Sequence, residues 1–489
     1  MSCAAGPDII ESGLVLCLDA VNIGVPSTAE VLVVAGGGAG AVGTNGGGGG
    51  GAGGVLYNAA LSVSHGTAYS VTVGTGGTGH TGRGAGTSGN NSVFSSMTAI
   101  GGGVGSGNGS LAVTGGSGGG GDYWHAGASG TAGQGNAGGA GGYYLSLTLP
   151  ADSGAGGGGA GGVGENGRGS SGVAGAGGIG ILYSISGIST YYGGGGAGAS
   201  NDNNTRALGG LGGGGSGGVP NSMNGADGVA STGGGGGAGN GGGGNSGSGG
   251  SGVVIIKYLG PQKATGGFIS WDNGYTIHTF LTSGTFDTSG WRDVAGYRYN
   301  GTLTAGPTYS SANMGSVVFD GVDDYVTMGS GIDFAAVAFS AGFTINLWVF
   351  PTSAGMSALF SSAYGGSGTD WQTYIWSNTS TFGTAQRYGA GSQNDFSTAA
   401  NYPINNWYNV VTTSNNTTSY IYVNGQQITS AATGTIVNQP ASREVWLGRF
   451  KNYGIPFSGK ISVAHVYNRA LTAAEVAQNF NAQRGRFGI

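Results

Sequence analysis

Val31-Leu-Val-Val-Ala35 and Val253-Val-Ile-Ile256 are the apolar segments that bracket a stretch of sequence dominated by glycine. Residues 36–252, between them, hold most of the 118 glycines in this chain of 489 residues. Short apolar runs rich in β-branched side chains predict buried strands. We expect these two strands to pair and so to bring the ends of the glycine-rich stretch together.

The composition of the chain favours an ordered structure for the glycine runs. Charged residues make up only 7% of the sequence and aromatic residues 10%, whereas disordered chains are usually highly charged and poor in aromatics. Helices are not expected in the runs, since each glycine costs about 1 kcal/mol relative to alanine there. We expect extended threefold helices of the polyglycine II type, packed side by side and linked by backbone hydrogen bonds.

Segments with fewer glycines interrupt these runs. Residues 69–73, 91–94 and 111–113 are expected to be short strands, and residues 122–125, 143–149 and 201–206 are expected to be loops at the ends of the bundle. An aromatic cluster in a glycine background has little core to enter. Tyr123, Trp124 and His125 are therefore candidate contacts with a receptor or with a neighbouring subunit.

The rest of the chain has a different pattern. In residues 259–290, Asp272-Asn-Gly274 lies between two alternating segments, which predicts a β-hairpin. Residues 291–489 show short alternating strands at the spacing of an all-β sandwich. Thr472 and Glu475 have the spacing of a capping box, so we expect one C-terminal helix.

Three motifs in the C-terminal part are Phe319-Asp-Gly-Val-Asp-Asp-Tyr-Val326, Trp407-Tyr-Asn-Val-Val411 and Val466-Tyr-Asn-Arg-Ala-Leu471. Together they resemble the laminin-G/concanavalin A-like family, which implies a lectin-like β-sandwich. In that family, a strand similar to Gly13-Leu-Val-Leu-Cys-Leu-Asp19 precedes the sandwich by a short loop. The resemblance therefore implies that the glycine-rich module is inserted into a loop of the sandwich.

The expected fold class is all-β, a sandwich with an inserted glycine-rich module. The expected domains are residues 8–28, the first strand of the sandwich; residues 29–258, the glycine-rich module; residues 259–290, a hairpin connector; and residues 291–489, the sandwich with its C-terminal helix.

The glycine-rich module itself carries Tyr191-Tyr-Gly-Gly-Gly-Gly196 and Gly252-Val-Val-Ile-Ile-Lys-Tyr258. With the C-terminal sequence, these segments resemble virion proteins of tailed bacteriophages. The resemblance implies a tail fibre, spike or head fibre, made in the host cytoplasm and located on the virion. It implies a homo-oligomer, with a trimer as one arrangement, whose partners are other virion proteins and a host surface polysaccharide or outer-membrane receptor.

The function expected from these observations is non-enzymatic adhesion to the host surface, with a glycan as ligand. The alternative is a structural capsid or tail component, or a decoration protein, without receptor binding. A secreted cellular glycine-rich protein is a third class, against which the absence of a Sec-type signal peptide argues. An adhesin exposes its aromatic loops, whereas a structural component buries them against neighbours.

Two groups of residues in the sandwich are further candidates. Asp320, Asp323 and Asp324 supply oxygen ligands suited to calcium, although Asp residues also end strands through turn hydrogen bonds. Trp371, Tyr374 and Trp376 offer rings that stack on sugars, or they belong to the core of the sandwich. No other cofactor is expected.

Several functions are not expected from the sequence. Its 15 Lys and Arg residues are spread thinly, so nucleic acid is not an expected partner. Glutamates are few and no expected strand carries two acids on one face, so glycoside hydrolysis, which needs paired carboxylates, is not expected. No apolar run is long enough for membrane insertion. Cys3 and Cys17 are expected to be free or buried thiols.

Overall fold

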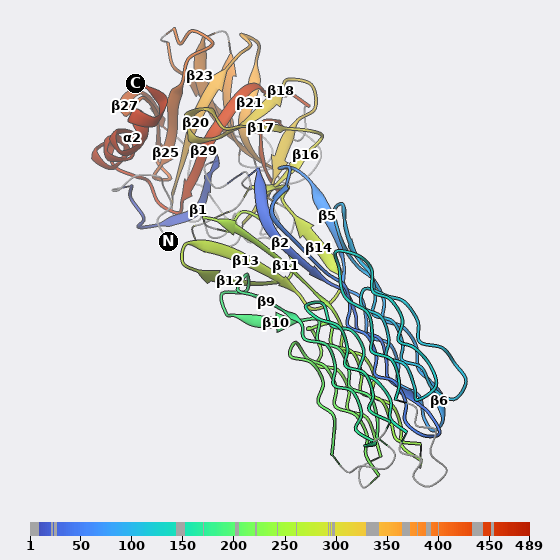
Figure 1. The fold of residues 1–489 in the computed structure, drawn as a ribbon. Coiled ribbons are helices and arrows are strands. Elements are labelled where there is room, and N and C mark those ends of the chain that lie inside the picture. The colour runs from blue at the N-terminus through green and yellow to red at the C-terminus, as the bar shows by residue number, and fades with distance from the viewer. Residues whose placement is uncertain are drawn as a thin grey trace.

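The computed structural model consists of β-strands, extended glycine runs and, within the described part of the chain, one α-helix. It describes residues 9–20, 23, 27–142, 152–169, 171–200, 205–220, 223–241, 243–260, 262–291, 293, 295, 299–328, 342–363, 372–378, 380–387, 393–399, 401–432, 444–450 and 454–489. Figure 1 shows a β-sandwich at one end, a smaller pair of sheets beside it, and a long bundle of glycine runs that projects away from both.

The glycine runs form a bundle of threefold helices. Run 47–54 lies at its centre, and consecutive residues of this run donate to three different neighbours in a pattern that repeats every third residue. Gly48, Gly51 and Gly54 donate to run 100–106, Gly49 and Ala52 to run 155–158, and Gly50 and Gly53 to run 233–236. Runs 35–41, 117–120 and 196–199 donate to it in return. This arrangement confirms the predicted polyglycine II-like packing.

Close approach of the runs explains why their interior positions are glycine. A Cβ atom on Gly48, Gly49 or Gly50 would lie within 3.0 Å of a carbonyl oxygen of an adjacent run, a separation that real Cβ atoms essentially never show. Residues 111–113, by contrast, form no strand, which corrects the prediction. Val113 instead donates its N–H to the Val104 oxygen within the bundle, because its glycine neighbours offer no pleated surface on which to pair.

Two sheets form a head between the bundle and the sandwich. β2 pairs antiparallel with β11, joining Val34 to Val253 and Val31 to Ile256, as the sequence predicts. The sheet orders are β12-β13-β11-β2-β4 and β14-β5-β7-β8, and a shared core that includes Val33, Phe94 and Phe286 fills the space between them. The strands of the head and bundle are β2 (Thr28–Val34), β3 (Ala41–Val42), β4 (Val55–Ser62), β5 (Ala68–Thr72), β6 (Gly84–Ala85), β7 (Ser92–Phe94), β8 (Met97–Ala99), β9 (Ile181–Tyr183), β10 (Thr190–Tyr192), β11 (Val253–Leu259), β12 (Phe268–Asp272), β13 (Tyr275–Phe280) and β14 (Gly284–Asp287).

The predicted hairpin of the connector is β12 and β13, and it belongs to the five-stranded sheet of the head. Asn273 and Gly274 both have positive φ, 47° and 82°. Two such residues suit a tight type I′ turn, which matches the twist of the paired strands. The Asn-Gly dipeptide is therefore the local cause of this hairpin.

The sandwich consists of two large antiparallel sheets. The first has the order β17-β18-β29-β20-β25-β26-β27, with β1 also paired to β29, and the second β15-β16-β19-β28-β21-β22-β23-β24. Their elements are β1 (Leu14–Asp19), β15 (Gly290–Trp291), β16 (Gly301–Thr304), β17 (Thr308–Ser310), η2 (Ala312–Met314), β18 (Ser316–Asp320), β19 (Tyr325–Thr327), β20 (Phe343–Pro351), β21 (Ser357–Ala363), β22 (Gln372–Asn378), β23 (Thr381–Arg387), β24 (Gln393–Ser397), β25 (Tyr408–Ser414), β26 (Thr418–Val423), β27 (Gln426–Ala432), β28 (Glu444–Leu447) and β29 (Ser458–Tyr467). The pairing of β1 with β29 places the first and last strands of the chain side by side.

Cys17 lies on β1 and is completely buried. It is disulfide-bonded, so the expectation of a free thiol at this position is wrong. The disulfide could not be predicted from the sequence, because the positions of two isolated cysteines do not show whether the fold brings their sulfur atoms together.

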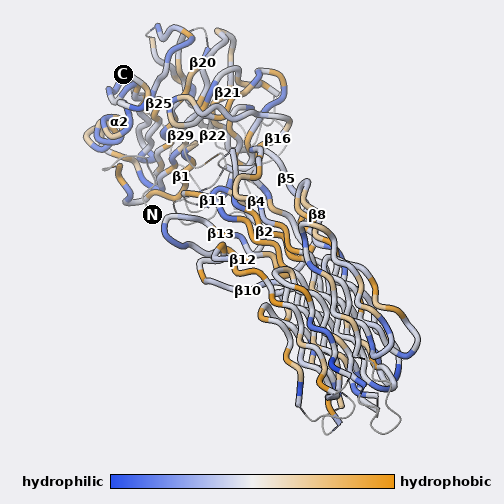
Figure 2. Tube along the Cα trace, viewed as in Figure 1, coloured by the Kyte–Doolittle hydropathy of each residue, from blue (hydrophilic) through white to orange (hydrophobic). Residues whose placement is uncertain are grey.

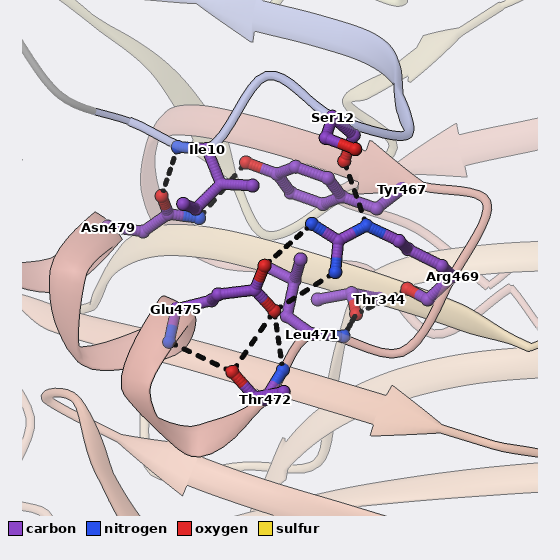
Figure 3. Close-up of polar contacts among 9 residues, drawn as sticks. All are labelled: Ile10, Ser12, Thr344, Tyr467, Arg469, Leu471, Thr472, Glu475 and Asn479. Carbon is purple, nitrogen blue, oxygen red and sulfur yellow. Dashed lines mark hydrogen bonds and ion pairs between the residues drawn. The ribbon is translucent and has the colours of Figure 1, made fainter.

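Helix α2 (Ala473–Phe487) begins at the predicted capping box. Thr472 accepts the Glu475 N–H, and the Glu475 carboxylate accepts the Thr472 N–H at 2.8 Å (Figure 3). Arg469 also pairs with Glu475, at 2.7 Å, and lowers its pKa to about 2. Asn479 on the same helix accepts the Ile10 N–H and donates to the Tyr467 hydroxyl, so the helix also holds the N-terminal segment (Figure 3).

Candidate functional site

The predicted loop of residues 122–125 lies at the end of the bundle farthest from the sandwich. β6, which pairs with β3, marks that end in Figure 1. The run of residues 100–106 ends beside β3, and Ser106 Oγ lies 3.4 Å from His125 Nδ1. The loop therefore belongs to the tip of the bundle. The predicted loops at 143–149 and 201–206 lie outside the described residues, except for Thr205 and Arg206.

Asp122 fixes the conformation of this tip loop. Asp122 is 2% exposed, and its carboxylate lies 2.6 Å from His125 Nδ1. The same carboxylate accepts the Trp124 N–H at 3.2 Å, and the Asp122 carbonyl accepts the His125 N–H at 3.1 Å. A short polar side chain that closes its own turn in this way pre-organises the loop.

Trp124 is the most exposed aromatic side chain of the loop. It is 56% exposed. Its ring lies 5.2 Å from the ring of the half-buried Tyr123, at an angle of 57°. Exposed aromatic rings on a fixed loop suit contact with a ligand, since they supply a large apolar area with few rotatable bonds.

Ser106, His125 and Asp122 do not form a catalytic triad. In a triad, serine and carboxylate contact opposite ring nitrogens of the histidine. Here both contact Nδ1, and Ser106 Oγ donates to the Ser110 carbonyl at 2.8 Å. The histidine therefore positions the loop and does not activate the serine.

The second aromatic group lies on the sandwich, far from the tip. Trp371 is outside the described residues, and Tyr374 lies on β22 with its side chain also outside them. Trp376 is half-buried against a small cluster formed by Ala358, Ala385 and Phe450. Figure 1 shows β23, the neighbour of β22, at the opposite end of the molecule from the tip. Trp376 therefore cannot contact the same small ligand as the tip loop.

The acidic turn between β18 and β19 brings three carboxylates together. Ligand oxygens of Asp320, Asp323 and Asp324 all lie within 4.8 Å of one another. Asp320 accepts the Val322 N–H at 2.7 Å and Asp324 accepts the Asp320 N–H at 2.8 Å, so part of the cluster serves the turn itself. Burial, with the negative charges of Asp320 and Asp323, raises the pKa of the Asp324 carboxyl.

An aromatic pair beside this turn was not predicted from the sequence. The rings of Tyr325 and Trp446 stack at 4.2 Å, and the Arg449 guanidinium lies 5.8 Å from the centre of the Tyr325 ring. Arg449 also donates to the Asp323 carbonyl at 3.1 Å, which joins the pair to the acidic turn. Stacked rings beside carboxylates are groups that can contact the faces and hydroxyls of a sugar. The strands that carry the rings, β19 and β28, are far apart in sequence, so no local sequence pattern predicts that the two rings stack.

The comparisons with known proteins match this architecture in two separate parts. Residues 19–259 match a family model described as a glycine-rich domain. Residues 320–477 match one described as the concanavalin A-like lectin/glucanases superfamily. The chain combines a glycine-rich domain with a concanavalin A-like domain. No curated protein matches the sequence.

Solved structures resemble the chain at low identity. The receptor binding domain of botulinum neurotoxin C/D mosaic serotype has 11% identity and a TM-score of 0.34, over 39% of this chain and 48% of that chain. The binding domain of Paraclostridial Mosquitocidal Protein 1 has 17% identity and a TM-score of 0.32, over 39% of this chain and 49% of that chain. The chain thus spans about half the length of the solved structures that it matches. In the described residues, no helix combines the length and apolar character that crossing a membrane requires.

We expect the acidic turn of the concanavalin A-like domain to bind Ca²⁺ weakly, with a dissociation constant of roughly 10⁻⁴ to 10⁻³ M. Burial first, and then the negative charges of Asp320 and Asp323, raise the pKa of Asp324, and a bound cation would offset the repulsion among the three carboxylates. The measurement is the shift of melting temperature during a calcium titration, compared between the natural protein and Asp324→Asn. The matched control is Asp227→Asn in the glycine-rich domain. An equal response of all three proteins would assign the three aspartates to the turn alone.

Proposed function

We propose that this chain is a non-enzymatic surface protein of a tailed-phage virion that binds a host-surface glycan through the tip of its glycine-rich domain. The observation that carries the proposal is the exposed Trp124, held on a loop that the buried Asp122 fixes at the far end of the bundle. The phage origin and the virion location rest on the sequence resemblance of the glycine-rich segments.

Each domain has its own role in the proposed function. Residues 291–489, with the first strand in residues 8–28, would dock to other virion proteins and offer a second glycan surface at Tyr325 and Trp446. Residues 29–258 would act as a stiff spacer, because each central run is hydrogen-bonded to neighbours on all sides. Residues 259–290 would connect the two. A stiff spacer presents its loops to a receptor without the entropy cost of ordering a flexible arm.

The proposed function is binding without catalysis, and the engagement of several acids in the fold supports it. Glycosidases need one carboxylate as acid and another as base or nucleophile, both free to reach the substrate. In the acidic turn, Asp320 and Asp324 accept backbone N–H groups of their own turn. Glu30 and Glu475 are engaged in ion pairs with Lys257 and Arg469. These acids hold the fold together and are not arranged to cleave a sugar.

We expect the purified protein to bind host cells saturably, and replacement of the Tyr123, Trp124 and His125 side chains by a Gly-Ser-Gly loop to weaken binding roughly tenfold or more. The matched control is Trp271→Ser, because Trp271 is also 56% exposed but lies on β12 in the head. Binding that both variants retain would move the contact away from the tip. Failure of the natural protein to bind would favour the alternative, a structural component or decoration protein without receptor binding.

A further inference from the structure

The head contains a pocket where the hairpin β12–β13 meets β14. It is lined by residues 266–268, which lead into β12, and by residues 279–285, from the end of β13 to the start of β14. We call it the head pocket. Its volume is about 300 Å³, at the lower end of the range for small-molecule sites. Figure 2 shows the hairpin beside the apolar strands β2 and β11 of the head.

The backbone around the head pocket is fixed by contacts behind it. Thr265 and Asp287 exchange two backbone hydrogen bonds, at 2.9 and 3.1 Å, which tie the two lining segments together. The Gly266 carbonyl lies 2.8 Å from Nδ1 of the buried His278, and Nε2 of that ring lies 3.1 Å from the Tyr258 hydroxyl. A carbonyl only accepts, so Nδ1 donates to Gly266 and Nε2 accepts from Tyr258. Walls held in this way need little ordering when a ligand binds.

Phe268 supplies an aromatic ring to the head pocket. It is 71% exposed and is the first residue of β12, the edge strand of its sheet. A ring in this position offers a large apolar area to a ligand with few rotatable bonds to order. Side chains alternate between the two faces of a strand, so Trp271, three residues further along β12, points to the opposite face. It does not line the pocket.

Hydroxyl groups form the polar part of the lining. Thr279, Thr282, Ser283 and Thr285 each carry one. Ser283 Oγ accepts the Val73 N–H at 3.0 Å, which fixes the oxygen and leaves its proton to donate. Thr282 and Thr285 are exposed, and within the described part of the chain their hydroxyls bond to no other residue. Each of these hydroxyls can both donate to a ligand and accept from it.

The lining carries no charge, although its residues are defined by their position around the pocket alone. The charged residues that flank the lining segments in sequence are Lys263, Asp272 and Asp287, and none of them lines the pocket. A phosphate or carboxylate ligand would therefore lack the cationic partner that such groups require. A wholly apolar ligand would cover the hydroxyls without replacing their hydrogen bonds to water.

We propose that the head pocket binds a neutral mono- or disaccharide. A sugar ring presents C–H groups on its faces and hydroxyl groups around its edge. The Phe268 ring would stack on such a face, and the hydroxyls of Thr282, Ser283 and Thr285 would exchange hydrogen bonds with the edge. This site is separate from the tip loop, which lies at the far end of the bundle. It does not depend on what the tip binds.

The test is a calorimetric titration of the full chain with maltose, lactose and cellobiose as neutral probes and glucose 6-phosphate as a charged one. We expect at least one disaccharide to bind with a roughly millimolar dissociation constant, and Phe268→Ala to weaken that binding roughly tenfold. Thr285→Val keeps the shape of the side chain and removes its hydroxyl, so it should weaken binding roughly 3- to 10-fold. The matched control is Trp271→Ala, an exposed aromatic residue on the opposite face of β12, which should bind as the natural protein does.

The substituted side chains are exposed, so the melting temperature should stay that of the natural protein, and a change in affinity then reports the contact with the sugar. A natural protein that binds none of the three disaccharides overturns the proposal, as does tighter binding of glucose 6-phosphate than of every neutral probe. Full binding by both Phe268→Ala and Thr285→Val also overturns it. The variant with the Gly-Ser-Gly tip loop should retain the sugar, and its failure to do so would place the sugar at the tip instead.

Discussion

Alanine at Gly50 should destabilise the glycine-rich domain by on the order of 3–5 kcal/mol, since overpacking and lost hydrogen bonds act together. The new Cβ would lie within 3.0 Å of carbonyl oxygens of Gly38 and Ala39. These are backbone atoms of an adjacent run, so they cannot rotate away as a side chain would. To make room, the central run must shift, and its bonds to neighbouring runs are then lost together.

The measurement is thermal unfolding combined with amide hydrogen exchange of the bundle. The matched control is Gly162→Ala, where the added Cβ would lie 3.1 Å from the Ile179 Cγ2 methyl and 3.8 Å from the Ile179 backbone nitrogen, at ordinary contact distance from the backbone. We expect that control to change the stability by less than about 1 kcal/mol, as for a surface substitution. Equal melting temperatures for the two variants would mean that the runs are not closely packed.

This expectation concerns individual positions and not glycine in general. Ala39 and Ala52 lie in the same interior runs and are completely buried. In a scan of residues 47–54, replacing each glycine with alanine should destabilise the domain, although Ala52 in the same run already carries a methyl group.

Local signals in the sequence predicted much of the fold. Two apolar strands flanking the glycine stretch predicted the pairing of β2 with β11, because the two ends of an inserted module must lie close together. The Asn273-Gly274 turn predicted the hairpin β12–β13, and Thr472 with Glu475 predicted the start of α2. The turn and the capping box are each defined by a few neighbouring residues, and the strand pairing is defined by two similar apolar segments.

The neighbour order of the glycine runs could not be predicted. One glycine run has the same chemistry as another, so the sequence cannot say that run 47–54 lies between run 100–106 and run 233–236. Strands β21, β23 and β24 were also missed. Their serine, threonine, glutamine and asparagine residues give no alternation of apolar and polar side chains, so only their position in the sheet defines them.

Some features of the candidate sites could be predicted from local sequence, and others depend on the fold. The tip loop was predicted because Tyr123-Trp124-His125 is an aromatic segment within a glycine-rich sequence. The role of Asp122 as the group that fixes this loop depends on its burial, which composition does not reveal. The stack of Tyr325 and Trp446 depends on the pairing of β19 with β28, which is a property of the sheet.

A buried ion pair joins the first strand of the sandwich to the C-terminal helix. Arg486, in the last turn of α2, lies 2.7 Å from Asp19 at the end of β1, and the two side chains are 4% and 0% exposed. Arg486 also donates to the Ser462 hydroxyl at 2.7 Å and to the Gly315 carbonyl at 3.0 Å. One guanidinium thus ties the first strand and the last strand of the sandwich to its helix.

Replacing Arg486 with methionine should lower the free energy of unfolding of the sandwich by about 3–5 kcal/mol, because it leaves the Asp19 carboxylate buried without its charged partner. Urea unfolding followed by tryptophan fluorescence measures this loss. Arg484→Met is the matched control, since Arg484 is exposed on the same helix. Adding Asp19→Asn to Arg486→Met should recover part of the stability, because the double variant no longer buries an unpaired charge. If Arg486→Met behaves like Arg484→Met, the ion pair does not anchor the helix, and the ring contacts of Phe487 with Trp348 and Trp407 hold it instead.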